Sequence, residues 1–161
     1  MPQLTFDQKT VYLIGWHMHF AAEHQIDGTR ATAEMHLVHA DAAGNPAAVV
    51  GIMVDVAAVG AVESTFLPTG VFQFPAQNET RAVPDVQLNM FQAIQGAGNL
   101  TNFWTYEGSL TTPPCSEGLR WFVSSDTLRL SQTQLDAIKV ANGGIYSARV
   151  PQLVKNQRVN Q

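Results

Sequence analysis

All five histidines of the chain fall within two short segments, and this clustering constrains the fold more than any other feature of the sequence. The segments are residues 16–24, Trp-His-Met-His-Phe-Ala-Ala-Glu-His, and 33–39, Ala-Glu-Met-His-Leu-Val-His. Side chains alternate between the two faces of a β-strand, so His17 and His19 would share one face. A histidine from a neighbouring strand could complete a set of three. Three neutral imidazoles with an open fourth position are typical of catalytic zinc sites.

Length and charge limit the remaining classes. With 161 residues, 45% of them hydrophobic and 14% charged, the chain can bury the core of a single domain spanning residues 1–161. Its net charge of −4 and lack of a basic cluster argue against a nucleic-acid partner. No apolar run is long enough to span a bilayer, and residues 1–7 lack the features of a signal peptide. We therefore expect a small-molecule substrate and no membrane partner, and the compartment stays unassigned.

Most of the chain has the pattern of short strands separated by turns. Residues 10–19 and 32–39 are rich in β-branched, aromatic and alternating residues, and the Asp27-Gly28 turn between them favours a hairpin. The continuous apolar run 48–54 is typical of a strand buried on both faces. The sequence thus predicts a mainly β fold with a central strand near Val50.

The second half of the chain is less regular. Residues 102–106 and 119–123 have strand composition, and residues 57–98 are expected to mix loops with short helical turns. The spacing of Ser131 and Gln134 matches a capping box and predicts that a helix begins there. We expect few and short helices.

Two interpretations of the histidines compete at first. They could be ordinary hydrogen-bonded strand residues, although five within so short a stretch favour a metal site. Alternatively, His17-x-His19-x3-Glu23 followed by Gly28 loosely matches the cupin pattern, in which two histidines and a glutamate bind the metal of an oxidoreductase. A cupin would place its remaining histidine on a later strand, but the sequence has none beyond His39.

A third interpretation comes from a family resemblance carried by several motifs in order. They are His17-x-His19, Ala22-Glu23-His24, Glu34-Met35-His36-Leu37-Val38-His39, the run Tyr106-x-Gly108-Ser109-Leu110-Thr111-Thr112-Pro113-Pro114-Cys115, Glu117-x3-Trp121 and Ala148-Arg149-Val150-Pro151-Gln152. Together they resemble the α-class carbonic anhydrases. The resemblance runs from about Phe6 to near the C-terminus and is weakest between residues 56 and 99. It implies a mixed, largely antiparallel central sheet.

The resemblance also implies a reaction and its metal. His17, His19 and His36 would bind Zn²⁺, and Glu34 would accept the outer ring N–H of His36. The chain would then be a zinc lyase that hydrates carbon dioxide reversibly to bicarbonate. Carbonic anhydrase is itself the standard example of zinc lowering the pKa of a bound water to about 7. A noncatalytic binding module of the same fold stays open as an alternative, although such modules typically lose a ligand histidine.

Roles for further residues follow from their motif positions. The hydroxyl of Thr111 would accept a hydrogen bond from the attacking oxygen and donate one to Glu23. The resemblance implies that His24 and His39 are structural. The substrate pocket would be lined by Val38, Val49, Leu110, Thr112 and Trp121.

Some positions depart from the family pattern. Gly15 stands where a glutamine usually hydrogen-bonds a ligand histidine, Ala22 replaces a serine, and Met18 replaces an aromatic residue. The chain also begins just before the first ligand strand, so we interpret it as the C-terminal part of a domain with an exposed sheet edge. From that we expect dimerisation through the edge and slow, buffer-dependent turnover. Cys115 and the sequons at Asn78 and Asn99 weakly favour a secreted or periplasmic parent.

Overall fold

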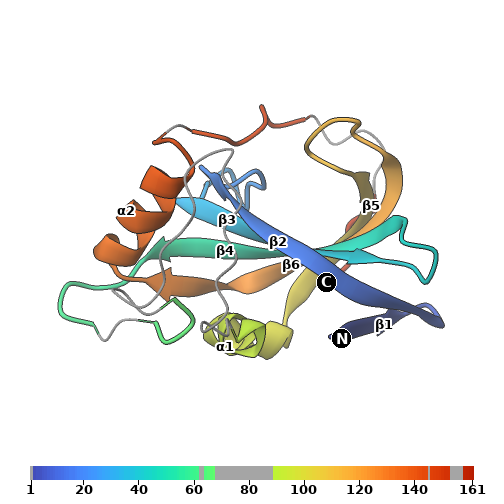
Figure 1. Ribbon diagram of the computed structural model, residues 1–161, viewed down its shortest axis with the longest axis horizontal. Coiled ribbons are helices and arrows are strands. Elements are labelled where there is room, and N and C mark those ends of the chain that lie inside the picture. The colour runs from blue at the N-terminus through green and yellow to red at the C-terminus, as the bar shows by residue number, and fades with distance from the viewer. Residues whose placement is uncertain (1, 62–63, 68–88, 145, 153–157) are drawn as a thin grey trace.

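The computed structural model describes residues 2–61, 64–67, 89–144, 146–152 and 158–161 (Figure 1). Within them, a six-stranded sheet has the order β1-β2-β3-β4-β6-β5. Its strands are β1 (Gln3–Phe6), β2 (Lys9–Phe20), β3 (Ala33–Ala40), β4 (Pro46–Val56), β5 (Phe103–Ser109) and β6 (Glu117–Leu130). The helices are α1 (Met90–Gly96), a 3-10 turn (Gly98–Leu100) and α2 (Gln132–Ala141). The sequon at Asn78 and much of the expected loop region lie outside the described residues.

The strand pairing confirms a mixed, largely antiparallel sheet. β4 and β6 run parallel, and every other neighbouring pair is antiparallel. β2 and β3 pair as the expected antiparallel neighbours, with His17 opposite His36. β4 lies between β3 and β6, as its continuous apolar run predicted.

One face of the sheet carries the main hydrophobic core. Met35, Leu37 and Ile52 from β3 and β4 pack there with side chains from both helices; Figure 1 shows α2 at the left of the sheet and α1 below it. The capping box of Ser131 and Gln134 is present, and it fixes the start of α2 so that its apolar side meets this core. No helix among the described residues has the length and apolarity needed to cross a membrane.

The opposite face carries a smaller apolar cluster and the histidines. Alternation along β3 sends Glu34 and His36 to this face while Met35 and Leu37 point into the core. The cluster itself contains Ala22, Val49, Met53, Leu119, Trp121 and Val123, with Trp104, Tyr106 and Leu110 packed against it. The ring of Trp121 lies 4.9 Å from that of His36, so this cluster adjoins the histidines directly.

Candidate metal centre

Two adjacent strands bring three histidines together. His17 and His19 come from β2 and His36 from β3, and one ring nitrogen of each lies within 4.8 Å of the others. Their ring centroids are 4.8 Å apart for His17 and His19, 5.2 Å for His17 and His36, and 4.8 Å for His19 and His36. Period-two alternation and the β2–β3 register explain this convergence.

The surroundings of His17 and His19 keep these two imidazoles neutral, the form that binds a metal. Burial of its ring and the neighbouring His36 and His19 lower the pKa of His17 to about 4, although the residue as a whole is exposed to solvent. Burial, followed by the effect of His36, also lowers the pKa of His19. At neutral pH both rings therefore offer lone pairs rather than positive charge.

His19 shows the clearest sign of an absent ligand. Its Nδ1 donates to the backbone carbonyl of Ser147 at 3.3 Å, so the lone pair of the neutral ring lies on Nε2. That Nε2 is buried and has no hydrogen-bond partner among the described residues. Buried polar atoms are normally satisfied. The donor set and this orphaned atom fit a metal ion held between the three rings.

His36 is oriented by the fully buried Glu34. Glu34 Oε1 accepts from His36 Nε2 at 2.8 Å and from His24 Nδ1 at 2.6 Å, and its Oε2 accepts the backbone N–H groups of Glu23 and His24, each at 2.9 Å. The first of these bonds leaves Nδ1 of neutral His36 as the free lone pair. Glu34 thus fixes both the ring of His36 and the loop after β2.

The network around Glu34 extends to Tyr106. Burial alone would raise the pKa of Glu34, but the hydrogen bonds from His24 and His36 hold it well below its ordinary value, so the carboxylate is ionised. Burial and the charges of Glu34 and Glu23 raise the pKa of Tyr106. Its hydroxyl therefore stays protonated and donates to His24 Nε2 at 2.6 Å.

A second group of metal-binding residue types shares one member with the first. His24, Glu34 and His36 also place one ligand atom each within 4.8 Å of the others. These atoms are joined by the direct hydrogen bonds of 2.6 and 2.8 Å, which occupy the lone pairs and protons concerned. The three-histidine group is therefore the better metal centre. Glu23, the carboxylate ligand of the cupin interpretation, belongs to neither group.

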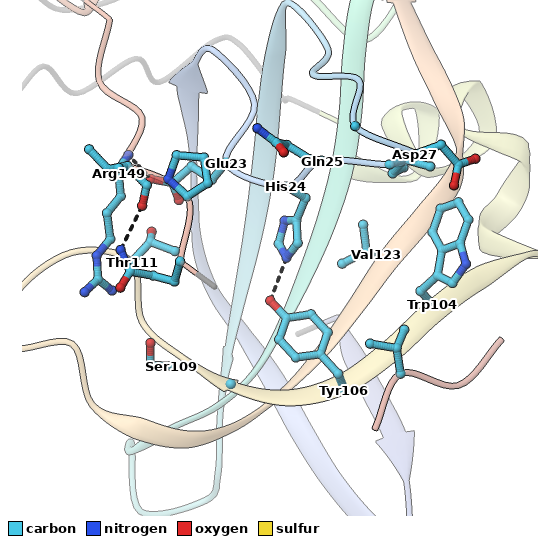
Figure 2. Close-up of a pocket in the computed structure, with 17 residues that line it drawn as sticks. Glu23, His24, Gln25, Asp27, Trp104, Tyr106, Ser109, Thr111, Val123 and Arg149 are labelled. Carbon is cyan, nitrogen blue, oxygen red and sulfur yellow. Dashed lines mark hydrogen bonds between the residues drawn. The ribbon is translucent and has the colours of Figure 1, made fainter. Parts of the chain in front are cut away.

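A pocket of about 540 Å³ has Glu23, His24 and Thr111 in its lining (Figure 2), and none of the three clustered histidines lines it. Figure 2 shows Glu23, Thr111 and Arg149 at one end of it, Tyr106 bonded to His24 near the middle, and Trp104 at the other end. Glu23 Oε1 accepts the backbone N–H of Arg149 at 2.6 Å. Its Oε2 is buried and has no hydrogen-bond partner among the described residues, and the hydrogen bonds found there include none between Glu23 and Thr111.

The residues expected to line a substrate pocket lie apart from this cavity's lining. Val49 and Trp121 are buried in the apolar cluster beside His36, and Leu110 packs against that cluster. Val38 is half-buried on the same sheet face, two residues beyond His36, and Thr112 is exposed. Apolar surface therefore adjoins the metal centre without forming an enclosed site in the described residues.

Several residues contribute to the site in ways that the sequence did not predict. Ser147 and Arg149 contribute backbone groups, and no residue type signals a backbone contact. Tyr106 and Arg149 both belong to motifs of the family resemblance, which gave neither of them a role. Gly51 lies opposite His36 in the β3–β4 ladder, and its position carried a signal, because a glycine inside the β-branched run of β4 indicates a close approach by another group.

The sequence of this chain matches known carbonic anhydrases over most of its length. The model of the family described as eukaryotic-type carbonic anhydrase matches residues 6–161. Human carbonic anhydrase 6 is 34% identical over 158 residues, covering 83% of this chain and 48% of that protein. A carbonic anhydrase of Klebsiella pneumoniae is 37% identical over 134 residues, covering 82% of this chain and 50% of its own. The chain spans about half the length of the curated relatives it matches.

Solved structures agree with the sequence matches. The α-carbonic anhydrase of Photobacterium profundum superimposes with a TM-score of 0.79 at 30% identity, covering 98% of this chain and 68% of that one. The α-carbonic anhydrase of Thermovibrio ammonificans gives a TM-score of 0.78 at 28% identity, with coverage of 95% and 64%. Dioscorin, at 24% identity and a TM-score of 0.71, shares the fold.

Proposed function

Because this chain belongs to the eukaryotic-type carbonic anhydrase family, we propose that it hydrates carbon dioxide reversibly to bicarbonate at a zinc centre held by His17, His19 and His36. The observation that carries the proposal is the buried Nε2 of His19, which has no partner in the described part of the chain and lies beside the two other imidazoles. All three ligand residues are present in this chain, which favours turnover over a purely binding module.

The chain's own residues would hold the metal and keep its ligands in the correct form. A zinc ion bound there supplies Lewis-acid chemistry, lowering the pKa of a coordinated water to about 7 as in carbonic anhydrases generally. Ser147 and Glu34 accept the outer N–H groups of His19 and His36, so the opposite nitrogen of each ring, left with its lone pair, would hold the ion. His17 is exposed and lies on the side open to solvent.

Glu23 and Thr111 would orient the attacking oxygen. An ionised carboxylate only accepts hydrogen bonds, so a hydroxyl that donates to Glu23 keeps only acceptor capacity for the reacting group. Glu23 Oε2 has no described hydrogen-bond partner, and Thr111 lines the same pocket, so the proton of the Thr111 hydroxyl has an acceptor available on this wall. The pair would thereby favour a protonated oxygen nucleophile over other anions.

Carbon dioxide is small and nonpolar, and apolar surface is available to it. We assign Val38, Val49, Leu110 and Trp121 to the substrate side of the metal and Thr112 to its polar border. Val49 and Trp121 belong to the cluster that touches His36, which supports this assignment.

Carbon dioxide hydration by the purified 161-residue chain tests the proposal. We expect about one zinc per chain at neutral pH and hydration that disappears when the metal is chelated. His36→Ala should abolish tight zinc binding and activity.

His39→Ala is the matched control. His39 lies on the same strand as His36, three residues further on and on the other face. Its ring bonds to the carbonyl of Leu37. This variant should keep both zinc and activity. Zinc-loaded protein without zinc-dependent hydration, or equal losses in the two variants, would contradict the proposal.

A further inference from the structure

Gly51 lies directly opposite His36 in the β3–β4 ladder, at the centre of the sheet face that carries the metal centre. It is buried and has no positive φ, so the backbone conformation does not require glycine there. A glycine inside a central strand otherwise weakens it, because it adds flexibility and packs no side chain. Its reason must therefore lie in what occupies the space above its Cα.

That space holds the carboxylate of Glu34. A Cβ added at Gly51 would lie 2.8 Å from Glu34 Oε1 and 3.8 Å from Glu34 Cδ, and 3.5 Å from the ring of Trp121. The Trp121 distance is an ordinary contact, whereas 2.8 Å is closer than real Cβ atoms approach an oxygen. The conflict is therefore specifically with the carboxylate.

The carboxylate has little freedom to yield. It is fully buried and accepts four hydrogen bonds, two from ring nitrogens and two from backbone amides. Moving Oε1 away from β4 would stretch the bonds to His36 and His24 together. Leaving buried donors without partners is costly, so the strain would pass to the ring of His36.

We propose that Gly51 is a positioning residue for the metal centre: its missing side chain reserves the space from which Glu34 orients His36. The inference rests on the proposed zinc function for its biological meaning. Its physical content, that Gly51 acts on His36 through Glu34, concerns the metal-free chain as well.

The test compares Gly51→Ala with Gly15→Ala. Gly15 lies on the neighbouring strand β2, two residues before His17, and a Cβ there meets no atom within 4 Å. In the metal-free protein, nitrogen NMR of the histidine rings should show the Nε2–H of His36 lost or weakened in Gly51→Ala and unchanged in Gly15→Ala. In zinc titrations, Gly51→Ala should weaken binding by about 10- to 100-fold, the usual cost of losing an outer hydrogen-bond partner.

A double-mutant cycle separates this role from simple packing. Glu34→Asp withdraws the carboxylate toward β3. Adding Gly51→Ala to this variant should therefore change zinc affinity by less than about 2-fold and leave the Nε2–H signal of His36 as it is in Glu34→Asp alone. Equal effects of Gly51→Ala in both backgrounds, or no effect on the His36 ring in the native background, would overturn the inference. Failure of carbon dioxide hydration alone would count against the proposed function and leave the ring measurement to decide on Gly51.

Discussion

Two glutamates lie within the same few ångströms of the histidines and have different surroundings. Glu34 has all its oxygen acceptors engaged by four donors and is fixed in place. Glu23 accepts one backbone N–H through Oε1 and keeps Oε2 unpaired within the described part of the chain. On this basis we propose that Glu34 holds a metal ligand in place and that Glu23 accepts a hydrogen bond from a hydroxyl.

Replacement of Thr111 separates metal binding from catalysis. Thr111→Ala should retain zinc and reduce carbon dioxide hydration by a factor on the order of 10², because it removes a group that orients the reacting oxygen. The neighbouring Thr112 is exposed and does not line the pocket, so Thr112→Ala is the control and should have a milder effect. Stopped-flow hydration with zinc analysis of the same samples measures both. Comparable activity losses in the two variants would remove Thr111 from the mechanism.

For single residues, the sequence predicts the relative positions of side chains that belong to the same motif. The shared face of His17 and His19 follows from alternation, and the position of Glu34 two residues before His36 follows the same rule. The carbonyl of Ser147, which bonds His19 from 128 positions away, could not be predicted from any residue type.

Among the elements, the C-terminal segment acts on β2 through backbone groups. The amides of Ser147 and Ala148 donate to the carbonyl of Phe20, whose own amide donates to the Ser147 hydroxyl at 3.2 Å. The same segment supplies the carbonyl that receives His19 Nδ1–H and the amide that bonds Glu23. It therefore ties the end of the ligand strand to the pocket wall.

Deletion of residues 146–161 tests this role of the segment. We expect zinc affinity to fall by about 10- to 100-fold, because His19 loses the carbonyl that fixes its tautomer. Ser147→Ala removes the hydroxyl but keeps that carbonyl, so its affinity should stay near that of the native chain. Isothermal titration with zinc compares the three proteins. Unchanged affinity after the deletion would show that β2 alone sets the orientation of His19.

The strands differ in how well their positions could be predicted from the sequence. β2, β3 and β4 have the expected alternation or continuous apolar runs and lie where the sequence predicted. β6 extends to Leu130, well beyond the expected 119–123. The sequence prediction ended too early because Ser124, Ser125 and Asp126 interrupt the apolar pattern of the strand. Within that interruption the Ser124 hydroxyl bonds the carbonyl of Asp126, a local contact that composition does not show.

Among the described strands of the molecule, β1 and β5 form the two edges of the sheet. β1 pairs only with residues 9–12 of β2, so the stretch of β2 with His17 has β3 as its one strand partner within the described residues. Ile14 on this stretch is 55% exposed. Unpaired strand edges favour association, so we still predict that the chain dimerises through this edge.

The stability of the metal-free chain should depend on pH through its histidines. The pKa values of His17, His19 and His39 are lowered in the folded state, chiefly by burial. Below the ordinary value of about 6.5 the unfolded chain then binds more protons than the folded one, so the free energy of unfolding falls as pH falls. Urea unfolding between pH 7.5 and 5 measures this slope.

His39→Gln should flatten the slope without altering the metal centre, because His39 lies on the opposite face of β3. A stability that is flat or rises on acidification would mean that the folded state protonates these rings as readily as the unfolded chain does.

The three-histidine zinc centre is tested most directly by identifying which histidine nitrogens bind zinc. Nitrogen NMR of the rings during zinc titration should show three residues changing together at one equivalent: His17, His19 through Nε2, and His36 through Nδ1. His24 and His39 should keep their metal-free signals, because both ring nitrogens of His24 are engaged in other hydrogen bonds and His39 lies on the opposite face of β3 from His36. Zinc-dependent change at His24 in place of His17 would assign the metal to the group that contains Glu34 and contradict the three-histidine centre.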